Sequence, residues 1–298
     1  MLQKNNIRYI AVPFRSGANR EGTQYAPAFL LNRLSLPKNI CTILPLNSEE
    51  TPLNNILKNG VYNYDEVLYM RNQLQLETYN TINECKRTII LGGDHSISIG
   101  SIAGVLKKYP NIGVIWVDAH TDINTENTSY TGNVHGMSLA SLIGICESEI
   151  NTSGIKLNPL NVFWVGVRDI DDGEWEIIQR LNIESHVFTC DKIHKVGIEN
   201  VMMQIFRMFK KNGVENIHIS FDIDVMDPSI VKATGTPVQY GLSEYECDRL
   251  IQCISDVEAQ NVVSVDFVEY NPLLDDEVYH TGQWCVSKLE KIVTILGK

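Results

Sequence analysis

The chain has 298 residues, of which 44% are hydrophobic, and its 25 basic and 36 acidic side chains give a formal net charge of −11. This apolar fraction is ordinary for a folded protein and argues against disorder. Phosphate backbones and anionic lipid would repel so acidic a chain, so we expect no nucleic-acid or membrane partner and a preference for cations. Because apolar runs are short and the first residues lack the apolar core of a signal peptide, we expect a cytoplasmic protein.

The predicted elements alternate between strand and helix. In chain order, runs of β-branched apolar residues predict strands at 7–12, 88–91, 112–117, 162–167, 217–221 and 262–265. Most are nearly continuous rather than alternating, as in strands buried on both faces of a parallel sheet. Helical spacing occurs at 66–85, 201–211, 243–255 and 286–296. The third helix begins with a capping box of Ser243 and Glu246. We expect an α/β fold with a parallel sheet, helices on both faces and a single domain over residues 1–298.

The seven cysteines include no CxxC pair. An odd number without that spacing argues against a disulfide framework and against a zinc knuckle. We expect them to be small buried hydrophobic residues in a reducing compartment.

Polar clusters directly follow three of the predicted strands. They read Gly-Gly-Asp-His-Ser at 92–96, Asp-Ala-His-Thr-Asp at 118–122 and Asp-Ile-Asp at 222–224. Ligands of parallel α/β sheets bind at the carboxyl ends of strands, so the three clusters can converge on one site. Side chains two residues apart on an extended chain point to the same face, which places both members of each Asp-x-His or Asp-x-Asp pair toward that site.

The clusters together offer two imidazoles and four carboxylates, namely His95, His120, Asp118, Asp122, Asp222 and Asp224. Six ligands, of which four are anionic, are too many for one tetrahedral zinc with a water. They suit two divalent cations that share carboxylates, and the carboxylate-rich mixture favours Mn²⁺. A lone Asp-x-Asp is usually a solvated turn, but four carboxylates packed together without a cation would be strongly destabilising.

These three motifs resemble the metal-binding motifs of the ureohydrolases, the arginase and agmatinase family. Four further segments resemble arginases more than agmatinases, and lie at 118–136, 166–174, 233–237 and 268–272. The matches run in the family's order over most of the chain. The resemblance implies a three-layer α/β/α fold, a homo-oligomer (trimer or hexamer) and hydrolysis of L-arginine to L-ornithine and urea by a hydroxide that bridges two Mn²⁺.

The resemblance also implies a role for each site residue. One manganese would be held by His95, Asp118, Asp122 and Asp222, and the other by His120, Asp118, Asp222 and Asp224. Asp122 would in addition pass a proton to the leaving amine. Glu269 would pair with the guanidinium, and His135 would carry protons to bulk water.

Substrate choice is expected to depend on the polar loop 124–133. By resemblance, Asn124, Thr131 and Asn133 face the α-carboxylate of arginine, while Asp171, with Glu174 behind it, takes the α-ammonium. The motif at 233–237 adds Thr236 to the substrate-binding set. An acid at 171 has no partner in agmatine, which favours arginine. A ureohydrolase for agmatine or guanidinobutyrate and a non-catalytic arginine-binding protein remain alternatives.

Two features depart from the family pattern. The segment 17–27 is poorer in glycine than the family's N-terminal loop and has Ala26 before its proline. Thr131 stands where arginases commonly have serine. Neither position is an expected metal ligand, so these departures bear on the substrate rather than on the type of reaction.

Overall fold

The computed structural model describes residues 7–35, 40–42, 57–84, 87–151, 154–254 and 262–297. Its centre is an eight-stranded sheet in the order β2-β1-β5-β10-β9-β6-β7-β8, with every pair of neighbours parallel. The strands are β1 (Ile7–Ala11), β2 (Ile40–Thr42), β5 (Arg87–Leu91), β6 (Gly113–Val117), β7 (Val162–Val167), β8 (Val187–Thr189), β9 (Ile217–Asp222) and β10 (Val262–Val268). A short antiparallel hairpin of β3 (Leu57–Lys58) and β4 (Val61–Tyr62) lies outside this sheet.

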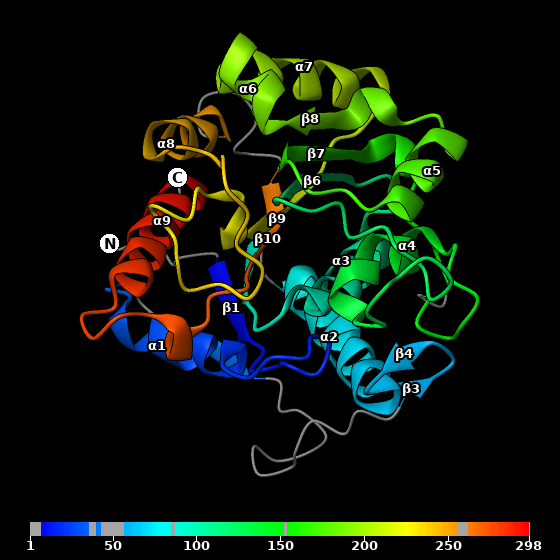
Figure 1. Ribbon diagram of the computed structural model, residues 1–298, viewed down its shortest axis with the longest axis horizontal. Helices are drawn as coiled ribbons and strands as arrows, with labels where there is room; N and C mark the ends of the chain where they lie inside the picture. Colours follow the sequence, from blue (N-terminus) through cyan, green and yellow to red (C-terminus); the bar gives the residue numbers. More distant parts are fainter. Residues whose placement is uncertain are drawn as a thin grey trace.

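Helices cover both faces of the sheet (Figure 1). One layer contains α2 (Tyr64–Glu84), α3 (Ser98–Lys108), α4 (Ser138–Ile143) and α5 (Asp172–Arg180). The other contains α1 (Ala26–Arg33), α6 (Cys190–Val196), α7 (Ile198–Lys211), α8 (Glu244–Cys253) and α9 (His280–Leu296). A separate hydrophobic core lies between the sheet and each helix layer. Successive strand residues alternate between the two cores, so that Ile89 lies in one and Ile90 in the other. The predicted three-layer α/β/α fold is confirmed.

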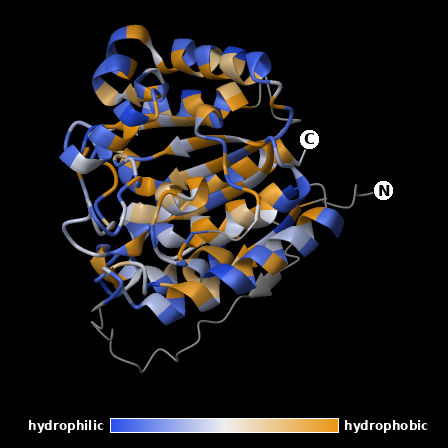
Figure 2. Cartoon of the chain, turned by 90° about the vertical axis from the view of Figure 1, so that its right-hand side faces the viewer, coloured by the Kyte–Doolittle hydropathy of each residue, from blue (hydrophilic) through white to orange (hydrophobic). Residues whose placement is uncertain are grey.

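The central strands are hydrophobic on both faces, while the helices carry hydrophilic residues as well (Figure 2). Every residue of β6, β7, β9 and β10 is buried. This explains why the apolar runs in the sequence are continuous rather than alternating. The capping box of Ser243 and Glu246 at the start of α8 is also present as predicted.

Several elements were not predicted. The edge strands β2 and β8 are three residues long, and the helices α1, α3, α4, α5 and α6 were not among the predicted helices. In α3 the reason is packing, because Cβ atoms at Gly100 and Gly104 would come within 2.9 Å of Arg71 O and 2.7 Å of Gln75 O on α2. Two glycines give a weak helix signal in sequence, yet here they allow two helices to approach closely.

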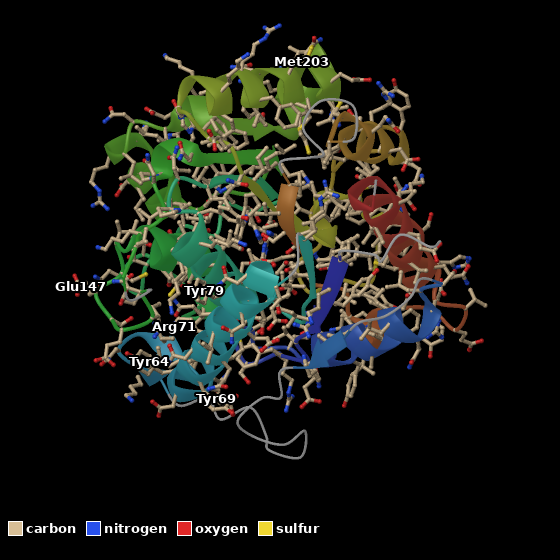
Figure 3. The ribbon with its side chains drawn as sticks, turned by 180° about the vertical axis from the view of Figure 1, so that it is seen from behind. Tyr64, Tyr69, Arg71, Tyr79, Glu147 and Met203 are labelled. Carbon is tan, nitrogen blue, oxygen red and sulfur yellow. The ribbon has the colours of Figure 1, made fainter. Side chains whose placement is uncertain are left out.

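Side chains along α2 also anchor a neighbouring loop. Figure 3 shows Tyr64, Tyr69, Arg71 and Tyr79 along this helix, with Glu147 nearby. The Arg71 guanidinium donates hydrogen bonds to the carbonyl oxygens of Glu149 (2.5 Å) and Asn151 (2.7 Å). The loop that follows α4 is thereby fixed to α2.

The prediction that the cysteines are buried holds where the structure describes the side chains. Cys146, Cys190, Cys247, Cys253 and Cys285 are all buried, and burial raises the pKa of Cys247 to about 12. The side chains of Cys41 and Cys85 lie outside the described residues. Within the described ranges, no helix has both the length and the apolar character needed to cross a bilayer.

Candidate active site

Three parallel strands end in the same local structure. After β5, β6 and β9, an aspartate carboxylate accepts a hydrogen bond from the backbone N–H two residues further on: Asp94 from Ser96 (3.0 Å), Asp118 from His120 (2.7 Å) and Asp222 from Asp224 (2.8 Å). This turn is typical of aspartate, whose short side chain can reach its own backbone. It fixes one oxygen of each carboxylate. The second oxygens of Asp118 and Asp222 lie beside His95, whereas that of Asp94 accepts a hydrogen bond from the backbone N–H of Gly17.

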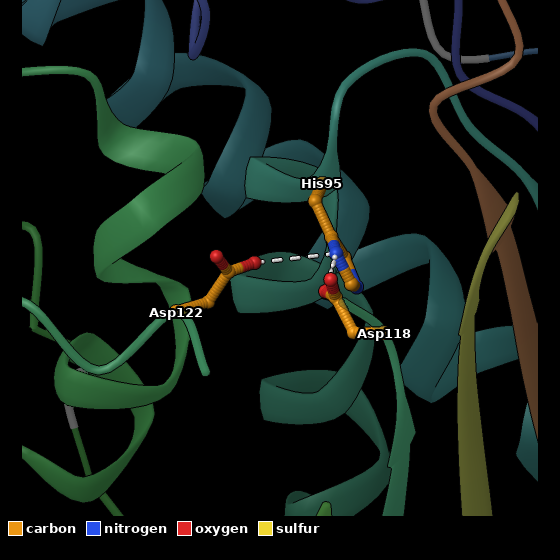
Figure 4. A group of neighbouring side chains, drawn as sticks. All are labelled: His95, Asp118 and Asp122. Atoms are coloured by element: carbon orange, nitrogen blue, oxygen red, sulfur yellow. Dashed lines mark ion pairs between the residues drawn. The ribbon is translucent and has the colours of Figure 1, made fainter. Parts of the chain in front are cut away.

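A first group of ligand atoms surrounds His95. Its Nδ1 atom lies 2.9 Å from Asp118 Oδ2, 3.2 Å from Asp122 Oδ2 and 3.1 Å from Asp222 Oδ2. Figure 4 shows the ion pairs that join the His95 ring to Asp118 and to Asp122. The His95, Asp118 and Asp122 ligand atoms lie within 4.8 Å of one another, close enough to hold a metal ion.

A second group shares Asp118 with the first. His120 Nδ1 lies 3.3 Å from Asp118 Oδ1 and 3.1 Å from Asp224 Oδ2. These three residues form the second set of ligand atoms within 4.8 Å. The structure therefore brings all six expected ligands together, with Asp118 common to both groups.

The donor set fits divalent cations. Among the described residues, His95 Nδ1 finds no hydrogen-bond partner of suitable geometry, although three carboxylates surround it. Burial, together with the charge of Asp118, raises the pKa of Asp122 well above its usual range. Burial and the charges of Asp224 and Asp118 do the same to Asp222. Cations would remove this repulsion, because they favour ionised carboxylates and a neutral imidazole.

Neighbouring side chains and backbone hold the ligands in place. Trp116 stacks on His95, with ring centroids 4.1 Å apart, and its Nε1–H donates to Asp118 Oδ2 (3.0 Å). Asp122 has a left-handed backbone (φ 49°), and its carbonyl accepts a hydrogen bond from the N–H of Leu139 (2.9 Å). Strained backbone of this kind is concentrated at functional sites.

Arg168 connects the loops around the second group. Its guanidinium donates hydrogen bonds to six backbone carbonyl oxygens, those of Gly166, Asp224, Val225, Met226, Val238 and Gln239. One side chain thus ties the end of β7 to the loop of Asp224 and to the segment after Thr236. The Thr236 hydroxyl in turn donates to Asp224 Oδ2 (3.0 Å).

The ligand groups lie in a polar cavity of about 230 Å³. The predicted site residues that line it are His95, Asp118, His120, Asp122, Asn124, Thr131, His135, Asp171, Glu174, Asp222, Asp224 and Thr236. Ser129, Tyr130, Gly136 and Asp169 also line it and were not predicted. Asp169 belongs to the motif at 166–174, and Ser129 and Tyr130 belong to the polar loop, so the sequence indicated these segments without distinguishing the residues.

Glu269 and Asn133 do not line the cavity. Glu269 is buried and its Oε1 accepts a hydrogen bond from the backbone N–H of His95 (2.7 Å). The same oxygen lies 3.3 Å from His135 Nδ1. Burial opposes protonation of His135, but the hydrogen bond and charge of Glu269 prevail and raise the pKa of His135 to about 9. The structure therefore places Glu269 against His135.

The far end of the cavity is organised by a helix cap. Glu174 accepts hydrogen bonds from the backbone N–H groups of Asp171 (3.0 Å) and Ile123 (3.1 Å). The Asn124 side-chain amide donates to Asp171 Oδ2 (2.9 Å), and its carbonyl oxygen accepts from Thr128 (2.8 Å). A carboxylate with one amide partner is thus presented to the cavity at the start of α5.

Comparison with known proteins agrees with this arrangement. A family profile described as "Arginase family" matches residues 5–291. The chain belongs to the arginase family. The arginases of Staphylococcus aureus (strain MRSA252) and Bacillus subtilis (strain 168) are each 35% identical to it, with 96% and 98% of both chains covered respectively. The solved arginase of Entamoeba histolytica, in complex with L-ornithine, is 34% identical with a TM-score of 0.86, covering 98% of this chain and 99% of that one.

Membership of the arginase family confirms two expectations from the sequence. The resemblance to ureohydrolases was correct, and the protein is a hydrolase that acts on the guanidino group.

Proposed function

We propose that this protein hydrolyses L-arginine to L-ornithine and urea with two Mn²⁺. The observation that carries the proposal is the cavity itself, which has six clustered ligands and, in its lining, the polar end formed by Asn124 and Asp171. The arginase relatives support the choice of substrate. Agmatine fits less well, because it has no α-amino or α-carboxylate group for this polar end.

His95, Asp118, Asp122 and Asp222 would hold one ion, and His120, Asp118, Asp222 and Asp224 the other. When bound, two divalent cations supply the Lewis acidity that makes water a nucleophile near neutral pH. This acidity is needed because guanidinium is delocalised and a poor electrophile.

Asp122 is proposed to move the proton. Its carboxylate is buried and borders the cavity. A carboxylate in this position can accept a proton from water and return it to the leaving amine. The left-handed backbone of Asp122 aims this group at the cavity.

His135 and Glu269 are proposed to connect the cavity with bulk water. His135 lines the cavity and is partly exposed, whereas Glu269 is buried behind it. An imidazole in that position can exchange protons with solvent. Glu269 holds the ring. To pair with a guanidinium as well, Glu269 would need a rearrangement, because it does not line the cavity in this structure.

The polar end of the cavity is proposed to select the amino-acid group. Asp171 would bind the α-ammonium, with Glu174 fixing its backbone. Asn124, Thr131 and Asn133 would face the α-carboxylate, and Thr236 would hold Asp224 in place. Asn133 needs a rearrangement of the loop to take part, because it does not line the cavity in this structure.

The function is tested by measuring urea release from L-arginine with Mn²⁺-loaded protein. The Asp122→Asn variant tests the role of Asp122 in this reaction, because asparagine tolerates the left-handed backbone and keeps the side-chain shape while it removes the charge. We expect a loss of activity of about a hundredfold or more, with Mn²⁺ content measured alongside. Unchanged urea release at unchanged Mn²⁺ content would contradict the role of Asp122.

We further propose that residues 1–298 act as a single domain in a cytoplasmic homo-oligomer, a trimer or a hexamer. The family profile supports the single domain, because its match extends over residues 5–291. Light scattering on the purified protein measures the mass of the assembly. A monomer would contradict this part of the proposal.

A further inference from the structure

A buried chain of hydroxyl groups leads away from His95 on the side opposite the cavity. His95 Nε2 lies 2.8 Å from Ser220 Oγ, and Ser220 Oγ lies 3.0 Å from Ser98 Oγ. Ser98 Oγ donates to Asp266 Oδ2 at 2.8 Å. Ser98, Ser220 and Asp266 are all fully buried, so bulk water does not replace these contacts.

The fold brings this chain together from three elements. Ser220 on β9 and Asp266 on β10 are partners in register, and Ser98 is the first residue of α3. A second serine of α3, Ser101, donates to the same Asp266 oxygen at 2.5 Å. Ser101 therefore contacts the carboxylate but is not on the path to His95.

The direction of the hydrogen bonds in this chain is determined by His95 at one end and the Asp266 carboxylate at the other. A His95 ring that offers Nδ1 to a cation must carry its proton on Nε2. Nε2–H then donates to Ser220, whose hydroxyl must donate to Ser98, whose hydroxyl donates to Asp266. The carboxylate accepts at the far end, so each hydroxyl has one possible orientation.

We propose that Asp266 is a positioning residue that acts through Ser98 and Ser220 to hold His95 in its metal-binding tautomer. The inference rests on the proposed two-metal site. Partners of this kind are known to orient metal-binding histidines and to increase their basicity, and their loss weakens metal binding about 10–100-fold. Asp266 differs from a direct carboxylate partner because two hydroxyl groups separate it from the ring.

The competing interpretation is that Asp266 only stabilises the fold. His218 Nε2 lies 3.2 Å from Asp266 Oδ2, and both side chains are fully buried. A purely structural carboxylate would make such contacts too. If Asp266 only stabilises the fold, loss of the Ser98 hydroxyl and loss of the Ser101 hydroxyl should affect Mn²⁺ binding equally. If Asp266 acts on His95 through Ser98, only the loss of Ser98 should weaken Mn²⁺ binding.

The experiment compares Mn²⁺ binding by Ser98→Ala and Ser101→Ala in the full chain, using the electron paramagnetic resonance signal of free Mn²⁺. Each change removes one donor to the same Asp266 oxygen. We expect Ser98→Ala to weaken one of the two Mn²⁺ sites about tenfold and to leave the other unchanged. Ser101→Ala should keep both affinities within about twofold, and thermal unfolding of the chelated proteins checks that both variants fold.

Ser220→Ala gives a second test one step closer to His95 and should weaken the same site. Equal effects of Ser98→Ala and Ser101→Ala, or equal weakening of both Mn²⁺ sites, would overturn the role of Asp266. If Ser98→Ala bound Mn²⁺ at both sites as tightly as the unchanged protein does, the role of Asp266 would be contradicted but the proposed function would not. Failure of the unchanged protein to bind Mn²⁺ would contradict the proposed function as well.

Discussion

Two acidic residues at the site have a left-handed backbone, which side chains other than glycine rarely adopt. Asp122 has φ 49° and Glu269 has φ 67°. Each conformation is held by a backbone hydrogen bond, from Leu139 N–H to Asp122 O and from Glu269 N–H to Gly93 O, both 2.9 Å. Such a conformation costs about 1–3 kcal/mol. At both positions it turns a carboxylate toward an imidazole.

The contact between Glu269 and His135 predicts how the pKa of His135 depends on the charge of Glu269. The pKa of His135 is raised to about 9, so the pair stabilises the fold below the ordinary histidine pKa and this stabilisation is lost as pH rises through about 9. Glu269→Gln keeps the acceptor for the His95 N–H but removes the charge. We expect the pKa of His135 in the metal-free protein to fall toward its ordinary value.

Nuclear magnetic resonance titration of the His135 ring measures this change. The ring of His186 is a suitable internal control, because it contacts Val162 O and Phe163 rather than Glu269. An unchanged pKa of His135 in Glu269→Gln would show that other groups hold its proton.

The N-terminal loop departs from the family pattern, yet it supports the site. Gly17 N–H donates to Asp94 Oδ2 (2.9 Å), and Gly17 O accepts from His135 N–H (3.0 Å). A Cβ at Gly17 would lie 2.1 Å from Ser96 Oγ and 2.5 Å from Asp94 Oδ1. One glycine therefore connects the turn after β5 with the backbone of His135.

We expect Gly17→Ala to lower the free energy of unfolding by about 1–3 kcal/mol, because the added methyl group overpacks this contact. Gly136→Ala is the matched control, since a Cβ there meets nothing within 4 Å. Thermal unfolding of both metal-free variants measures the difference. Similar unfolding temperatures for the two would contradict the close packing around Gly17.

The main elements of the fold could be predicted because their signals are local. Buried parallel strands such as β7 require continuous apolar runs, and the start of α8 has its capping box in the sequence. The short edge strand β8 and the glycine-containing α3 depend on their neighbours in space. A prediction from local sequence pattern does not know these neighbours, so it missed both elements.

The site likewise contains residues whose positions follow from local sequence and residues whose positions depend on the surrounding fold. The clustering of these side chains was predictable because strand ends and two-residue spacing determine where Asp118 and His120 point. Asp169 and Tyr130 reach the cavity only through the paths of their loops. Position at the end of β10 likewise indicates that Glu269 is near the site, but not that it lies behind His135.

For the whole molecule, the charge of −11 is concentrated in part around the cavity. Burial and Asp118 raise the pKa of Asp224 as well, which shows that ionised carboxylates repel one another there. Bound cations would remove this repulsion. The net charge of the sequence therefore overstates the negative charge that the working protein would expose.

We expect saturating Mn²⁺ to raise the unfolding temperature by about 5 °C or more, because binding to the folded state alone stabilises it by mass action. Asp118→Asn should lose most of this increase, since Asp118 belongs to both ligand groups. Asp169→Asn is the control, because Asp169 lines the cavity outside those groups. Equal responses of the two variants in calorimetry would place the cations elsewhere.

The central claim is that the cavity selects L-arginine. The most direct test compares kcat/KM for urea release from L-arginine and from agmatine, with Mn²⁺-loaded protein. We predict a preference for L-arginine of at least about a hundredfold, because agmatine has no α-amino or α-carboxylate group with which Asp171 and Asn124 could form further hydrogen bonds. Asp171→Asn should reduce this preference. Equal rates with the two substrates, or faster release from agmatine, would contradict the account.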